Sequence, residues 1–156
     1  MEFIDQKNQH IKLRYCKPND QPTGDHVLGL TLYRNTMLFT KHRLRGIEFP
    51  GGKCEKGEST LQALAREIYE ETGGHLQTAY YIAQYTVTNA QRSFTKDVYV
   101  CIIDAIEPKV DYFETHGPIR FQSIEEVPKG DKSFLLEDPA ILKCVERMTE
   151  LGFYDT

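Results

Sequence analysis

The chain has 156 residues, the size of one ordinary domain, so we expect a single domain over residues 1–156. Its composition of 40% hydrophobic and 27% charged residues excludes a disordered or collagen-like chain. The net charge of −4 excludes general electrostatic binding of polyanions, so a phosphate ligand would need local cations or a metal ion.

The sequence also argues against membrane insertion and secretion. No apolar run approaches the roughly 20 residues of a membrane-spanning helix. Residues 1–12 mix charged and polar side chains and lack the apolar core of a signal peptide. We therefore expect a cytoplasmic protein that makes no membrane contact.

The first predicted elements form a β-hairpin. Residues 26–33 and 36–40 are rich in residues that favour strands, and the polar pair Arg34 and Asn35 separates them. Such a two-residue break between strands is typical of a tight turn.

A helix is predicted next. Ser59 can cap its first turn together with Gln62 in a capping box, and the helix should end near Thr72, where Gly73 can adopt the left-handed conformation of a C-cap. Apolar residues recur at helical spacing and predict the buried face: Leu61, Leu64, Ala65 and Ile68.

The second half of the chain predicts two long strands and a further helix. The strands cover residues 78–87 and 98–106, and the helix starts at Asp138 and Pro139 and stops before Gly152. Strands interspersed with two amphipathic helices indicate an α/β (α+β) fold, an α/β/α sandwich with a mixed sheet.

Three carboxylates lie on one side of the first helix. Glu67, Glu70 and Glu71 have the spacing i, i+3 and i+4, so their side chains share one face, which we expect to be exposed to solvent. Like charges at this spacing destabilise a helix unless a divalent cation lies among them. Oxygen ligands favour Mg²⁺ or Mn²⁺ over zinc. A solvated acidic face is the alternative interpretation.

The residues around these carboxylates form a longer motif. Its members are Gly52, Glu58 and the run Arg66-Glu67-Ile68-Tyr69-Glu70-Glu71-Thr72-Gly73. This spacing resembles the Nudix box, G-x5-E-x7-R-E-U-x-E-E-x-G-U, in which U is aliphatic. Only the last position departs from the pattern, because Gly74 stands where an aliphatic residue is usual.

The resemblance extends beyond the box. Residues 45–53 and 111–118, together with the order of the predicted elements, resemble the YtkD-type, MutT-related nucleoside triphosphate pyrophosphohydrolases of Gram-positive bacteria. This resemblance implies the Nudix fold and hydrolysis of a nucleoside triphosphate with Mg²⁺, or with Mn²⁺ in its place.

The resemblance also implies roles for individual residues. Glu70 and Glu71 would be the principal metal ligands, joined by Glu67 and by the carbonyl of Gly51. Arg66 would orient these carboxylates through charge-assisted hydrogen bonds. The general base is either Glu67 or Glu114, and the two remain open alternatives, with an exposed loop acid as the other interpretation of Glu114.

Cations for the phosphates can be sought upstream of the glycine pair. Lys41 and Arg43 are the preferred pair, with a solvated basic stretch as the alternative. In MutT-type enzymes the start of the late helix lies near the purine, and Glu137 holds that position here. A carboxylate accepts hydrogen bonds, so Glu137 would favour guanine, which offers N1–H and an N2 amino group. The alternative is that Asp138 only caps the helix and Glu137 is its exposed neighbour.

The predicted function is therefore Mg²⁺-dependent hydrolysis of a purine (deoxy)nucleoside triphosphate, of the dGTP or 8-oxo-dGTP type, to the monophosphate and pyrophosphate. One alternative is hydrolysis at the triphosphorylated 5′ end of RNA. Another is a catalytically silent Nudix domain that senses nucleotides. The oligomeric state is left open by the sequence.

Overall fold

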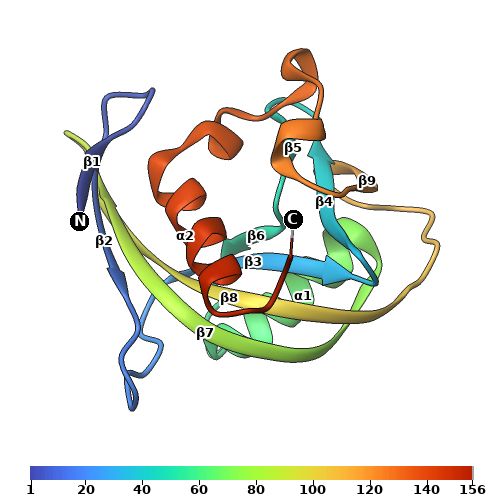
Figure 1. Ribbon diagram of the computed structural model, residues 1–156, viewed down its shortest axis with the longest axis horizontal. Coiled ribbons are helices and arrows are strands. Elements are labelled where there is room, and N and C mark those ends of the chain that lie inside the picture. The colour runs from blue at the N-terminus through green and yellow to red at the C-terminus, as the bar shows by residue number, and fades with distance from the viewer. Residues whose placement is uncertain (156) are drawn as a thin grey trace.

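The computed structural model describes residues 1–155 and contains one mixed sheet with a helix on each side (Figure 1). The sheet order is β1-β2-β7-β8-β3-β4-β5, with β6 paired to β3 and β9 paired to β4. The strands are β1 (Glu2–Ile4), β2 (His10–Tyr15), β3 (His26–Tyr33), β4 (Thr36–His42), β5 (Gly46–Glu48), β6 (Gly51–Lys53), β7 (Gly74–Thr88), β8 (Ser93–Ile106) and β9 (Thr115–Phe121).

The sheet divides between β3 and β4. These strands pair only beside their turn, at Leu32 with Met37 and Tyr33 with Thr36. The start of β3 pairs instead with β6, while the end of β4 pairs with β5 and β9. Along its other edge β3 runs parallel to β8 over its whole length. The short strand β6 therefore lies where the two halves of the sheet separate.

The helices α1 (Thr60–Thr72) and α2 (Pro139–Glu150) belong to two different cores. Alternating side chains of β8 supply both cores: Tyr99 and Cys101 pack with α1, and Val98 and Val100 pack in the core that contains α2. Three short 3₁₀ helices precede α2, namely η1 (Ile124–Glu126), η2 (Lys129–Asp131) and η3 (Phe134–Glu137). The predicted α/β/α sandwich with a mixed sheet is confirmed.

Both ends of α1 have the predicted caps. Ser59 Oγ accepts a hydrogen bond from the Gln62 amide at 3.1 Å, and Gln62 Oε1 accepts one from the Ser59 amide at 2.9 Å. Gly73 ends the helix at φ 74°, and its amide donates to the Tyr69 carbonyl at 2.8 Å. These local signals determine where the helix starts and stops.

The predicted buried stripe of α1 is partly wrong. Leu61 is 51% exposed, whereas Ala63, Glu71 and Thr72 are buried with Leu64 and Ile68. The sheet therefore packs against a face that is turned toward Glu71.

The two long strands extend beyond their predicted limits. The first, predicted over residues 78–87, is β7 at Gly74–Thr88, and the second, predicted to begin at residue 98, is β8 and begins at Ser93. Among residues 1–155, no helix combines the length and the apolar character that crossing a membrane requires.

A substitution at the end of α1 tests this account of the cap. A Cβ on Gly73 would lie 2.1 Å from the Glu107 carbonyl oxygen, on a backbone with positive φ. We expect Gly73→Ala to lower the free energy of unfolding by at least about 1–2 kcal/mol in urea denaturation. The control is Gly130→Ala, because a Cβ there meets nothing within 4 Å. Equal stability of the two variants would contradict the assignment.

Candidate active site

Arg66 gathers the acidic side chains at the start and middle of α1. Its guanidinium donates to both oxygens of Glu58, at 2.7 and 3.0 Å, and to Glu67 and Glu70. It also donates to the Lys53 carbonyl at 3.1 Å, which ties the helix to β6. The hydrogen bond with Glu58 contributes most to the raised pKa of Arg66. Arg66 therefore stays charged and contacts the carboxylates of Glu58, Glu67 and Glu70.

Glu71 differs from its neighbours because it is buried. Only 8% of the residue is exposed, and its Oε1 accepts a hydrogen bond from the Gly51 amide at 3.0 Å. Burial, with the charges of Glu67 and Glu48 adding to it, raises the pKa of Glu71 to about 9. The expectation that this carboxylate faces solvent is therefore wrong, since the orientation of α1 places it beneath β6.

Glu67 lies between these two environments. Burial raises the pKa of Glu67, and the nearby charge of Arg66 opposes this rise. A Cβ on Gly52 would lie 2.6 Å from Glu67 Oε2, so a side chain at that position would displace the carboxylate. Gly51 and Gly52 thus bring bare backbone against the acidic face of α1.

These residues fit a hard divalent cation. Their donors are the oxygens of Glu67, Glu70 and Glu71, and the carbonyl of Gly51 adds another, because the N–H and C=O of one strand residue point to the same side. Within residues 1–155 no three acidic, histidine or cysteine side chains already converge as a metal cage. Arg66 and the Gly51 amide hold the carboxylate oxygens that a metal ion would take over.

A cavity of about 490 Å³ begins at the same glycine pair. Gly51 and Gly52 line it, and so do Tyr85, Lys96 and Asp138, which come from β7, β8 and the N-terminus of α2. Tyr85 pairs with Lys96 across the two strands, and the Lys96 ammonium lies 5.7 Å from the Tyr85 ring centroid. The glycine pair that contacts Glu71 and Glu67 of α1 therefore also lines a cavity whose other walls come from both halves of the chain.

The three groups contributed by β7, β8 and α2 share an unusual polar environment. Tyr85 is 1% exposed, and within the part of the chain that the structure describes its hydroxyl has no hydrogen-bond partner. Burial raises the pKa of Asp138, and burial lowers the pKa of Lys96. Asp138 Oδ1 accepts from the Ala140 amide at 2.9 Å. Such groups have hydrogen-bonding capacity left for a polar ligand.

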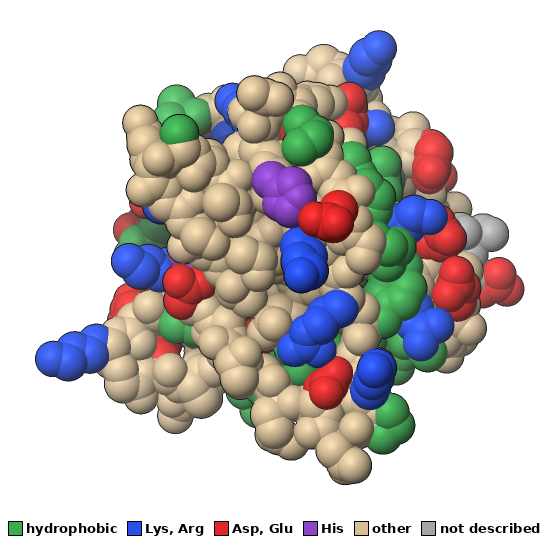
Figure 2. Space-filling model, turned by 90° about the vertical axis from the view of Figure 1, so that its left-hand side faces the viewer, with side chains coloured by type: hydrophobic (Ala, Val, Ile, Leu, Met, Phe, Trp, Pro, Cys, Tyr) green, Lys and Arg blue, Asp and Glu red, His purple; other side chains and the backbone are tan. Residues whose placement is uncertain are grey.

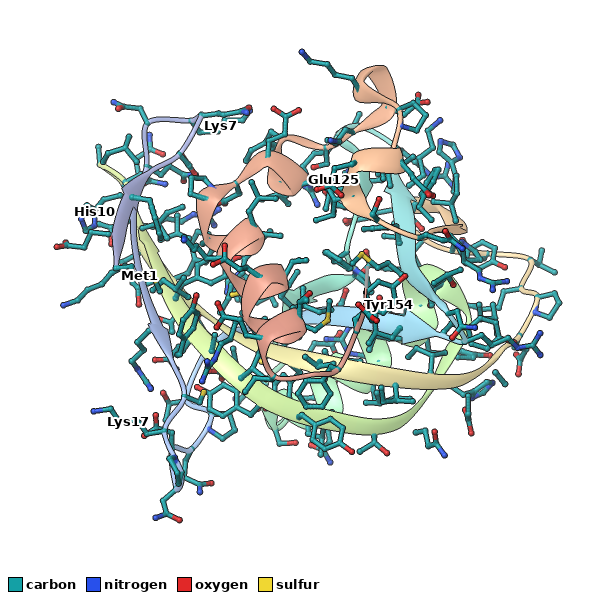
Figure 3. All side chains as sticks on the ribbon, in the orientation of Figure 1. Met1, Lys7, His10, Lys17, Glu125 and Tyr154 are labelled. Carbon is teal, nitrogen blue, oxygen red and sulfur yellow. The ribbon has the colours of Figure 1, made fainter. Side chains whose placement is uncertain are left out.

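A second acid lies in the wall near Glu71. Glu48 is 4% exposed and accepts hydrogen bonds from Arg45 at 2.9 and 2.8 Å, and from Ser133 Oγ at 2.9 Å. Arg45 lines the cavity with it. Two cations stacked on aromatic rings also line the cavity: Lys7, labelled in Figure 3, lies 4.8 Å from the Phe134 ring centroid, and the Arg92 guanidinium lies 5.0 Å from that of Phe94.

Several residues predicted for the site lie outside this cavity. Lys41 approaches Asp131 at 3.8 Å, and the exposed Arg43 is not in the lining either. The Glu114 side chain is 89% exposed, and its Oε2 lies 3.9 Å from His42 Nε2.

Glu137, predicted to contact the base, is likewise exposed and accepts a hydrogen bond from Gln6 at 3.0 Å. Its neighbour Asp138 lines the cavity instead, because the turn from η3 into α2 directs the two side chains apart. The sequence carried one signal for the missed residues. Lys96 lies two residues from Phe94 and from Val98, so all three side chains share one face of the strand, and this face points inward.

The sequence is similar to known proteins over most of its length. The model of the NUDIX domain matches residues 22–136. A protein of Bacillus subtilis (strain 168) named YtkD, described as a candidate 8-oxo-dGTP diphosphatase, is 33% identical over 99% of each chain.

Solved structures are similar over most of the chain as well. The crystal structure of the Bacillus subtilis pyrophosphohydrolase BsRppH is 30% identical, covers 99% of each chain and has a TM-score of 0.89. A NUDIX hydrolase from Nitrosomonas europaea is 22% identical, with a TM-score of 0.67 over 85% of this chain and 93% of that one.

Because the carboxylate of Glu71 is buried, we expect the stability of the fold to depend on pH. Its pKa of about 9 in the metal-free fold exceeds the ordinary value of a glutamate in an unfolded chain. Its contribution to stability is thus complete below that ordinary value and is lost as the pH rises through 9. Mg²⁺ competes with the proton, so thermal stabilisation by Mg²⁺ should increase between about pH 6 and pH 9.

Thermal denaturation of Glu71→Gln with and without Mg²⁺ checks this prediction. The metal-free variant should lose less stability than the parent across that pH range, because its amide does not ionise. Glu125→Gln, at an exposed position of η1 (Figure 3), is the matched control and should behave as the parent. A parent protein whose response to Mg²⁺ is independent of pH would contradict the environment assigned to Glu71.

Proposed function

The chain belongs to the Nudix hydrolase family, and from this we propose that it hydrolyses purine (deoxy)nucleoside triphosphates of the dGTP or 8-oxo-dGTP type to the monophosphate and pyrophosphate, with Mg²⁺ or Mn²⁺. One observation carries the proposal. Gly51 and Gly52 line the cavity and also contact the carboxylates of Glu71 and Glu67. A base in the cavity would thus have its phosphates beside the acidic face of α1.

The protein groups divide the chemical work. Glu67, Glu70, Glu71 and the Gly51 carbonyl would hold the metal, and Arg66 keeps the carboxylates in place. When bound, Mg²⁺ neutralises phosphate charge and lowers the pKa of a water molecule. Glu67 is favoured as the general base over Glu114, because only Glu67 lies within the carboxylate cluster.

For recognition of the base we propose Asp138 in place of Glu137, because Asp138 lines the cavity. Guanine presents O6 as an acceptor and N1–H with the N2 amino group as donors. Lys96 can donate to O6, and Asp138 can accept from N1–H and N2. Adenine can form fewer hydrogen bonds with Lys96 and Asp138, so guanine should be preferred. The unpartnered Tyr85 hydroxyl adds a further polar contact in the cavity.

A 5′-triphosphorylated RNA is the second candidate substrate. The similarity to BsRppH, named as a pyrophosphohydrolase, extends over nearly the whole of both chains and favours it. The charge of the molecule does not favour RNA, because binding of its backbone needs clustered cations. On the outer face of β1 and β2, acidic and basic side chains are mixed instead (Figure 2). A silent sensor is disfavoured, because all three carboxylates are present and two of them, Glu67 and Glu71, contact the glycine pair that lines the cavity.

A substrate panel tests the proposed function. GTP, dGTP, 8-oxo-dGTP and triphosphorylated RNA are incubated with Mg²⁺, and pyrophosphate and orthophosphate are measured separately. We expect pyrophosphate from the nucleotides, and a fall in kcat of about 10² to 10⁴ in Glu70→Gln because a charged metal ligand is lost. Glu125→Gln again serves as the control. Normal turnover by Glu70→Gln at saturating Mg²⁺ would contradict the metal assignment.

The base itself can be tested through Asp138 and Lys96. Asp138→Asn retains a helix cap but replaces one acceptor by a donor, and Lys96→Met removes the ammonium and keeps the length. Both should lower the ratio of kcat/KM for dGTP to that for dATP by about tenfold or more. Glu137→Gln should leave the ratio unchanged. If only Glu137→Gln lowers the ratio, the original prediction is right and the cavity assignment is wrong.

A further inference from the structure

The last turn of α1 carries two of the residues assigned to the metal, Glu70 and Glu71, although it is the negative end of the helix dipole. A helix leaves its last carbonyls without partners inside the helix, and carboxylates are unfavourable at this end. The turn holds no basic residue of its own. Hydrogen-bond donors for its carbonyls, and a compensating charge, must therefore come from other elements.

Lys109 supplies the charge. It belongs to the loop of residues 107–114 that joins β8 to β9, and its ammonium donates to the carbonyls of Tyr69 and Glu70 at 3.0 Å each. The Gly73 amide that ends the helix also donates to the Tyr69 carbonyl. The Glu71 carbonyl, the next along the chain, needs donors from elsewhere.

Two buried threonines donate to the Glu71 carbonyl. The distance is 2.9 Å from Thr40 Oγ1 of β4 and 3.2 Å from Thr115 Oγ1 of β9. Both residues are no more than 1% exposed. Each hydroxyl also has a longer alternative, the Gly117 carbonyl at 3.3 Å for Thr40 and the Tyr112 carbonyl at 3.4 Å for Thr115. A hydroxyl has one proton, and the shorter distance favours Glu71 as its acceptor in both cases.

An irregularity in the strand pairing brings these two hydroxyls to one carbonyl. The strands β4 and β9 pair side by side in Figure 1, and their register shifts between Thr40 and His42. Opposite this shift, Gly117 has a φ of 93°, and its amide donates to Thr115 Oγ1 at 3.2 Å. Thr115 therefore accepts from its own strand and can direct its proton to the helix. Bulges of this kind redirect side chains beside active sites.

We propose that Thr40 and Thr115 are positioning residues for the metal site, because they hold the backbone of Glu71 while its carboxylate points to the glycine pair. The inference deepens the proposed function and rests on its assignment of Glu71 as a metal ligand. Glu71 Oε1 accepts from the Gly51 amide. Groups outside α1 thus fix this residue at both its carbonyl and its carboxylate. Neither threonine belongs to the Nudix box or lines the cavity.

Removal of the hydroxyls tests this role through metal affinity. Thr40→Val and Thr115→Val keep the shape of the side chain and leave the buried Glu71 carbonyl with one donor fewer. The dissociation constant of Mn²⁺, measured by electron paramagnetic resonance without substrate, should rise about fivefold or more in each variant. Thr40→Ser and Thr115→Ser retain the hydroxyl and should bind Mn²⁺ as the parent does. With dGTP, kcat at saturating Mg²⁺ should change far less than the Mg²⁺ concentration that gives half of it.

Thr31→Val is the matched control. Thr31 is buried too, and its hydroxyl donates to a carbonyl outside α1, that of Leu38. This variant should lower the melting temperature, as the others do, and leave Mn²⁺ binding unchanged. Parental Mn²⁺ affinity in Thr40→Val and Thr115→Val, or an equal loss in Thr31→Val, would overturn the proposal. Thr115→Val, which removes the longer bond, decides the test if Thr40→Val does not fold.

Glu71→Gln separates this failure from failure of the proposed function. It should weaken Mn²⁺ binding by the parent fold, because a charged ligand is lost. If it does so while both valine variants bind as the parent does, only the positioning role is wrong. If Glu71→Gln binds Mn²⁺ as tightly as the parent, the metal assignment and the positioning role are both wrong.

Discussion

Electrostatic repulsion among Glu67, Glu70 and Glu71 is the constraint on which the site depends. One turn of α1 carries all three carboxylates, and this arrangement is stable only if the surroundings compensate their charge. Arg66 compensates Glu67 and Glu70 through hydrogen bonds, whereas burial of Glu71 favours its protonated form. A divalent cation would take over both functions, so the metal-free fold already has the electrostatics of a binding site.

The split in the sheet connects this helix to the substrate cavity. The strands β3 and β4 pair only beside their turn, and the start of β3 pairs with β6. The two glycines of β6 can therefore lie between α1 and the cavity. A side chain at Gly51 would meet the Val27 carbonyl oxygen at 2.3 Å, and one at Gly52 would meet Glu67. The same close backbone approach therefore fixes the position of β6 and brings the carboxylates of Glu67 and Glu71 against the backbone that lines the cavity.

What the sequence could predict was local. The caps of α1 at Ser59 and Gly73 depend on neighbouring residues, and both are confirmed, as is the family that the Nudix box indicates. The cavity depends on the register between β7 and β8, which brings Tyr85 opposite Lys96. The residue pattern of each strand alone does not define this register. The burial of Glu71 depends on the rotation of α1 against the sheet, which periodicity alone defines too coarsely.

The central claim is that the acidic face of α1 binds the metal beside the glycine pair. Paramagnetic broadening of backbone amide NMR signals by substoichiometric Mn²⁺ tests it most directly. The account predicts that the signals of Gly51, Gly52 and residues 67–71 disappear first, while those of Glu125 and Cys144 persist, and that excess Mg²⁺ restores them. Broadening centred elsewhere, or uniform broadening that Mg²⁺ does not reverse, would contradict the account.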